Sequence, residues 1–191
     1  MEQRNIVDLA THYFLRLKNF LEHSEVEPIL LSKFGKDMED VPLIYVLKGF
    51  CYELIAHMAK VDNDYSDAEA LLLEKITGER LPISHIKANI LDSFVTSKKV
   101  PVLSLLVCYA DSILHSKYPN MTAVDDVFCL AQHVLTSTMN ADGRARLSES
   151  AKFLEILKPI RQFLDDYKKK RDNNSPIDWE SIRQKSFKNY L

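Results

Sequence analysis

The chain has 191 residues, enough for one well-buried core but short for two independent domains. Hydrophobic residues make up 46% of it and charged residues 27%, a globular balance that excludes a wholly disordered chain. The net charge is −2, which does not favour nucleic acid as a partner. The chain has four glycines and no GxGxxG or P-loop pattern, so the usual nucleotide-binding loops are also unsupported.

The cysteines and the N-terminus indicate in which cellular compartment the protein is expected. Cys51, Cys108 and Cys129 are sparse and lie in apolar surroundings, as buried thiols do in a reducing compartment. The N-terminus is acidic and polar and does not resemble a signal peptide. The most apolar run, 100–110, is too short to cross a bilayer. We therefore expect a cytoplasmic, soluble protein that contacts membranes only through partners.

Apolar residues recur with a helical period along most of the chain, and prolines and glycines mark the turns. Gly35 and Gly78 follow helix ends, TAVD at 122–125 resembles a capping box, and Pro159 predicts a kink or break. No alternation with period two is sustained. The fold class is therefore all-α, a single domain of about seven or eight helices. The pattern places them at 6–21, 27–34, 42–61, 66–77, 82–94, 101–116, 122–139 and 148–171.

Residues 172–191 form a polar linker and a short amphipathic helix that begins at Asp178 and follows the helical domain of residues 1–171. The apolar side of this helix carries Trp179, Ile182 and Phe187. The sequence favours docking of this side on its own domain. The alternative is that these three side chains bind a partner.

Asp62, Asp64, Asp67 and Glu69 lie within eight positions, just before a run of leucines. Ser66 and Glu69 match the capping box SxxE, which explains the serine and the glutamate without any ligand. An EF-hand is excluded, because loop position six would be Asp67 instead of glycine and position twelve would be a leucine. A smaller site for a hard divalent cation, built from Asp62, Asp64 and Glu69, stays open.

The same residues carry a resemblance to a known family. The stretch KVDNDYSDAE at 60–69 and the looser ADGRARLSE at 141–149 each follow a helix with a Phe-Cys pair. This arrangement resembles the TerB-like (tellurite-resistance) family over about residues 42–160, whose signature is an Asp-Gly turn followed by SxxE. The first copy departs from it at Asn63, where glycine is usual, and the second spaces its serine differently.

The resemblance implies an all-helical fold with an internal two-fold pseudo-repeat in a bacterial stress-response or defence protein. Carried over residue by residue, it implies metal ligands at Asp62, Glu69, Asp142 and Glu149. It further implies binding of a divalent cation (Ca, Mg, Mn or Zn) and work as a scaffold or sensor in protein complexes. No catalytic activity is implied.

Two further patterns concern possible zinc ligands and a basic run. Glu53 and His57, and likewise Cys129 and His133, are four residues apart, so two facing helices could hold zinc, although buried thiols are the simpler interpretation. The basic run at 168–171 is interpreted as a solvated helix end.

The first functional hypothesis is therefore a non-catalytic TerB-like module that binds a divalent cation. The alternative is a metal-free helical adaptor or immunity-type protein that holds a protein partner in an apolar groove. A protein partner is expected under both, and no enzyme signature supports catalysis.

Overall fold

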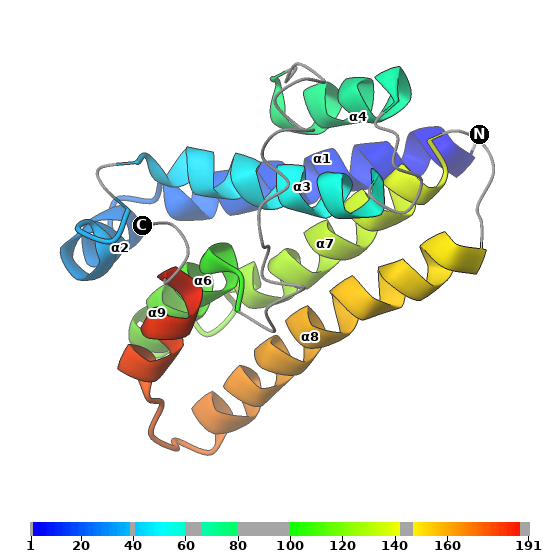
Figure 1. The fold of residues 1–191 in the computed structure, drawn as a ribbon. Coiled ribbons are helices and arrows are strands. Elements are labelled where there is room, and N and C mark those ends of the chain that lie inside the picture. The colour runs from blue at the N-terminus through cyan, green and yellow to red at the C-terminus, as the bar shows by residue number, and fades with distance from the viewer. Residues whose placement is uncertain (1, 39–40, 60–65, 80–99, 142–146, 188–191) are drawn as a thin grey trace.

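The computed structural model describes residues 2–38, 41–59, 66–79, 100–141 and 147–187. These residues form eight helices and no strand, which confirms the all-α prediction. In chain order, and with the labels of Figure 1, the helices are α1 (Glu2–Leu21), α2 (Val26–Phe34), α3 (Leu43–Ala59), α4 (Asp67–Thr77), α6 (Val102–Leu114), α7 (Ala123–Met139), α8 (Leu147–Asp172) and α9 (Trp179–Phe187). The helix predicted over 82–94 lies outside the described residues.

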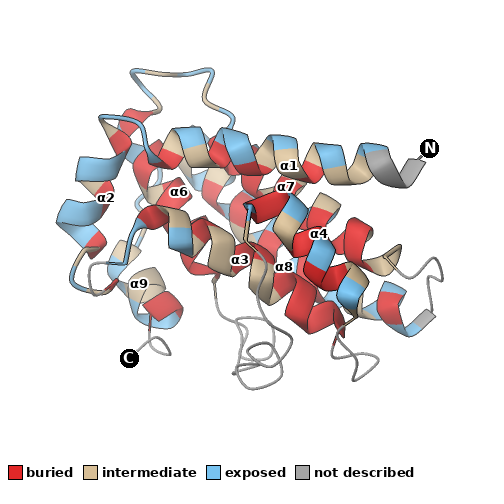
Figure 2. Ribbon diagram, turned by 90° about the horizontal axis from the view of Figure 1, so that it is seen from above, coloured by how far each residue is buried: buried red, intermediate tan, exposed pale blue. Residues whose placement is uncertain are grey.

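Helix α7 occupies the middle of the bundle and contacts α1, α3, α4, α6 and α8. Helix α6 is apolar on nearly all sides, as expected of a helix surrounded by others, and most of its residues are buried. The buried residues of the long helices face one another in Figure 2, while the outer faces are exposed. Among the described residues, no helix combines the length and apolar character needed to span a bilayer.

Helix α4 begins and ends as its sequence predicts. The backbone N–H of Ser66 donates to Oε2 of Glu69 at 2.8 Å, and the backbone N–H of Glu69 donates to Oγ of Ser66 at 3.2 Å. This is a complete capping box, which satisfies two backbone donors at the helix start. Gly78 ends the helix with a left-handed φ of 76°, which a residue with a side chain adopts at a cost.

Two local predictions are wrong. Thr122 does not cap α7 through its side chain, because its Oγ1 instead donates to Asp126 and accepts from Arg16 of α1. Of the kink or break predicted at Pro159, the break is absent, because α8 runs uninterrupted over 26 residues. Pro159 lies on the exposed side of that helix, where water can satisfy the carbonyl that a proline leaves without a donor.

Two glycines offer a paired test of the backbone argument. No described atom lies within 4 Å of a Cβ built on either Gly49, inside α3, or Gly78. Gly49→Ala should raise the free energy of unfolding by about 0.5–1 kcal/mol, because alanine restricts the unfolded chain more. Gly78→Ala should lower it by about 1 kcal/mol, because its φ is left-handed. Urea unfolding measures both, and a shift of the same sign in the two variants would contradict the assignment.

Candidate functional site

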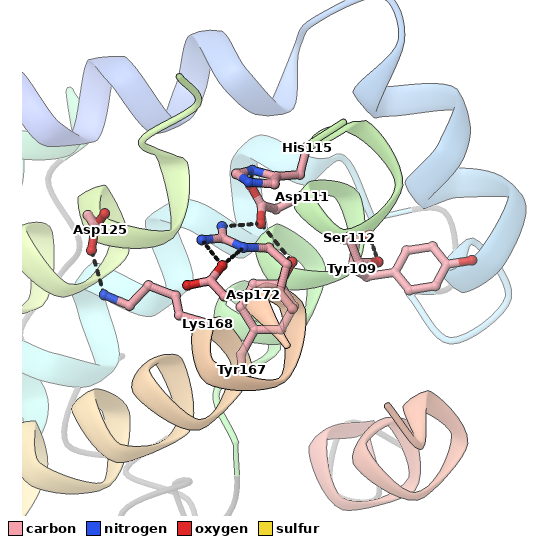
Figure 3. A network of polar contacts seen from close by, with 9 residues as sticks. Tyr109, Asp111, Ser112, His115, Asp125, Tyr167, Lys168 and Asp172 are labelled. Carbon is pink, nitrogen blue, oxygen red and sulfur yellow. Dashed lines mark hydrogen bonds and ion pairs between the residues drawn. The ribbon is translucent and has the colours of Figure 1, made fainter. Parts of the chain in front are cut away.

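A buried carboxylate lies at the junction of α6 and α8. Asp111 of α6 has no exposed surface, and its Oδ2 accepts a hydrogen bond from the Tyr167 hydroxyl at 2.6 Å. The same oxygen accepts from Nη1 of Arg171 at 2.8 Å. Tyr167 and Arg171 are one helical turn apart on α8, so both reach the same point of α6 (Figure 3). Because an unpaired buried charge is costly, this cluster fixes where α8 lies against α6.

The other oxygen of Asp111 faces His115, one turn further along α6. Nδ1 of His115 lies 3.7 Å from Oδ1 of Asp111, too long for a hydrogen bond, and neither atom has another hydrogen-bond partner within the described residues. The complete burial of Asp111 favours an interhelical anchor over a catalytic carboxylate, since a substrate would have to reach the carboxylate through the helix junction.

Helix α9 covers a surface next to this anchor. The ring of Trp179 lies edge-on to Tyr109 of α6, with centroids 5.3 Å apart, and 6.0 Å from the ring of Tyr167. At the other end of α9, Phe187 stacks on Phe34 of α2 at 5.8 Å, and Phe34 in turn contacts Tyr109 at 5.1 Å. We use the name aromatic groove for the three side chains that the aromatic rings of α9 contact, namely Phe34, Tyr109 and Tyr167.

A charge pair fixes the register of α9 in the aromatic groove. The guanidinium of Arg183 donates from Nε and Nη2 to the two carboxylate oxygens of Asp37, each at 2.8 Å. These hydrogen bonds, and others to Glu180, raise the pKa of Arg183 above its ordinary value. Such a two-point contact has a defined geometry, which a single lysine charge would lack.

The connection to α9 is short and solvent-facing. Residues 172–176 are exposed, and the turn after α8 places Asn174 at a φ of 53°, which asparagine tolerates better than most residues. Helix α9 itself has nine residues, too few to be stable alone in water. Its order therefore depends on its contacts with the rest of the chain.

The predicted tail residues lie in this interface. Trp179 and Ile182 are partly buried against the core and Phe187 is buried. Helix α9 thus docks on its own chain, which is the arrangement that the sequence favoured. A direct role for Trp179, Ile182 and Phe187 in binding a partner stays a prediction, and here their side chains are engaged within the chain.

The predicted cation ligands are only partly described. Asp62, Asp64 and Asp142 lie outside the described residues. Glu69 holds the capping box of α4 with 9% of its surface exposed, and Glu149 lies in the first turn of α8 with 7% exposed. Within the ranges that the structure describes, no three Asp, Glu, His or Cys side chains form a group that could hold a metal ion.

The alternative zinc set of Glu53, His57, Cys129 and His133 is fully described and does not form such a group. The ring of His133 instead stacks on Tyr13 of α1, with centroids 5.5 Å apart and planes 6° from parallel. Burial lowers the pKa of His133, and a hydrogen bond with Cys129 raises the pKa of Tyr13. These side chains act in the packing of α1 on α7.

An apolar cleft of about 480 Å³ lies where the first residue of α2 and the last residue of α6 come together. Beside it the carboxylate of Glu25 accepts from Nζ of Lys117 at 2.7 and 2.8 Å and from the Tyr118 hydroxyl at 2.5 Å. Since Glu25 already neutralises Lys117, no charge is left over to select a ligand. The cleft is lined by Phe20, His23, Val26, Leu114, Lys117, Tyr118, Pro119, Asn120 and Met121.

Sequence reasoning missed Asp111, Tyr109 and Asp37. Asp111 carried a signal, because an acid inside the most apolar helix must find a partner. The basic run, predicted as a solvated helix end, has two paired members: Arg171 is the partner of Asp111, and Lys168 pairs with Asp125 of α7 at 2.8 Å.

The fold and the covered groove together define an all-helical module whose terminal helix occupies a surface of its own domain. No protein-family model, no curated protein and no solved structure matches the chain.

The anchor predicts a loss of stability in alkali. Burial, followed by the hydrogen bond to Asp111, raises the pKa of Tyr167 well above that of a free tyrosine. A raised folded-state pKa contributes stability that is present below the unfolded pKa of about 10 and is lost as the pH rises further. Between pH 10 and 11 the free energy of unfolding should therefore fall by about 1 kcal/mol through this group. Urea titrations at both pH values should show a smaller fall in Tyr167→Phe, and an equal fall would contradict the assignment.

Proposed function

We propose that the chain is a non-catalytic helical adaptor that binds a protein partner through the aromatic groove. The observation that carries this proposal is that a nine-residue helix on an exposed linker covers the groove. When α9 leaves, the aromatic side chains of Phe34, Tyr109 and Tyr167 lose their cover. A groove lined with aromatic residues on rigid helices is typical of sites that hold an amphipathic helix.

The charge pair between Arg183 and Asp37 offers a way to open the groove. Arg183→Asp places two acids opposite each other and should favour the undocked state of α9, because like charges at this distance repel. Lys185→Asp is the matched control, since Lys185 is exposed on the same helix and the charge change is the same. Trp179 is the only tryptophan of the chain, so its fluorescence reports docking directly.

The adaptor proposal predicts that opening the groove increases capture of a partner. Full-length wild type, Arg183→Asp and Lys185→Asp would serve as baits in extracts of the source cells, with bound proteins quantified by mass spectrometry. The Arg183→Asp bait should capture up to about tenfold more partner than the wild type. The reason is that only molecules with α9 undocked can bind the partner, so the apparent affinity rises with their fraction. Adding Tyr109→Ala to that bait should remove the gain. The same bound set on all baits would reject the proposal.

A divalent cation site, as the TerB-like resemblance implies, is our second proposal. It is supported by the burial of Glu69 and Glu149, and by the three acids Asp62, Asp64 and Asp67 that precede Glu69 in the sequence. In this proposal Asp62, Asp64 and Glu69 hold the ion, Asp142 contributes, and the protein acts in the cytoplasm in a stress or defence system. The capping box is the competing explanation for Glu69.

Calorimetric titration with Ca²⁺, Mg²⁺, Mn²⁺ and Zn²⁺ separates these explanations. The wild type should release or absorb heat with at least one cation, and Asp62→Ala/Glu69→Ala should not. Ser66→Ala is the control, because it removes the capping hydroxyl at a cost of about 1 kcal/mol in stability while keeping every proposed ligand. Ser66→Ala should therefore still bind. Absence of heat in the wild type with all four cations would reject the cation site.

A further inference from the structure

Helix α9 shows in atomic detail what the aromatic groove recognises. Its two aromatic anchors, Trp179 and Phe187, lie eight positions apart, which is a little over two helical turns. Trp179 contacts Tyr109 and Tyr167, and Phe187 contacts Phe34. A ligand with this spacing therefore spans the groove on one face of a single helix.

The charge between the anchors fixes the register of this recognition, and the two aromatic ends fix its direction. Arg183 lies midway between Trp179 and Phe187, and its guanidinium bonds both oxygens of Asp37. The side chain of Asp37 has 12% of its surface exposed and that of Arg183 33%, so the pair is partly shielded from water. A helix bound in the reverse direction would bring Arg183 to the same central place but exchange the two aromatic ends, which differ in size and in partner ring.

We infer that the partner presents an amphipathic helix of the α9 type, with aromatic anchors eight positions apart and an arginine midway, and that α9 is its competitor in cis. This inference rests on the proposed adaptor function and names the partner's recognition element. The contact between Arg183 and Asp37 is the latch of the closed state. Any partner must displace it to bring its own arginine to Asp37.

The inference is tested with a synthetic peptide of residues 177–187, IDWESIRQKSF, added in trans to the full chain. The chain carries Trp179→Phe, so the tryptophan of the peptide is the only one in the sample. Peptide fluorescence anisotropy gives the Kd for the closed chain and for the chain opened by Arg183→Asp. The opened chain should bind the peptide about tenfold more tightly, because its own α9 no longer competes.

Charge reversal provides the control for register. A chain with Asp37→Arg is also opened, since its own Arg183 then meets a like charge. The Asp37→Arg chain should bind the Arg183→Asp peptide about tenfold more tightly than the native peptide. The chain opened by Arg183→Asp, which keeps Asp37, should bind the native peptide about tenfold more tightly than the Arg183→Asp peptide. This crossed preference requires direct contact between position 37 and position 183 in trans, which a general loss of stability would not produce. Circular dichroism checks that both opened chains remain helical.

Three results would overturn the inference. The first is absence of peptide binding by either opened chain, and the second is equal binding of both peptides by both chains. The third is a concentration-dependent dimer of the opened chain in light scattering that excludes the peptide, which would assign the groove to a second copy of this chain. Partner capture without peptide binding would leave the adaptor function standing and reject this inference. Peptide binding without partner capture would show that the groove accepts an α9-like helix, but would reject the adaptor function and with it the partner that this inference names.

Discussion

The buried carboxylate of Asp111 is the constraint on which the rest of the site depends. A charge inside the most apolar helix of the bundle is tolerated when hydrogen bonds and an opposite charge compensate for lost water. In the described part of the chain, the hydrogen bonds to this carboxylate come from Tyr167 and Arg171 of α8. The carboxylate therefore sets the rotation and the height of α8 against α6. Apolar packing alone would specify both less sharply.

The position of α8 in turn builds the aromatic groove. Once Tyr167 points its hydroxyl at Asp111, its ring becomes part of the surface on which Trp179 rests. The position of Trp179 therefore depends on the buried cluster around Asp111, because the ring of Tyr167 belongs to that cluster and also contacts Trp179. Two kinds of contact then hold α9, and each contributes a different property. The aromatic contacts supply apolar burial that tolerates small shifts, and the bidentate pair of Arg183 with Asp37 selects one register.

Local sequence patterns predicted those elements that local physics decides. The box of Ser66 and Glu69 and the left-handed Gly78 bound α4 because each acts on the backbone within four residues. The pattern failed at Thr122, where Arg16, more than one hundred residues away in sequence, competes for the hydroxyl. It failed at Pro159 because sequence alone does not say which side of a helix faces water. The apolar side of α9 was visible in sequence, but its floor of Phe34, Tyr109 and Tyr167 comes from three helices that only the fold brings together.

The covalent tether of α9 decides how any partner must compete. A short linker keeps a tethered helix at an effective concentration in the millimolar range, far above that of most free proteins. A partner helix with the same contacts as α9 would therefore lose to it in the closed chain. Occupancy by a partner requires either additional contacts outside the aromatic groove or a change that weakens α9 alone. The latch of Arg183 and Asp37 is the natural place for such a change, because it shares no residue with the buried anchor and its loss leaves the contacts among Asp111, Tyr167 and Arg171 in place.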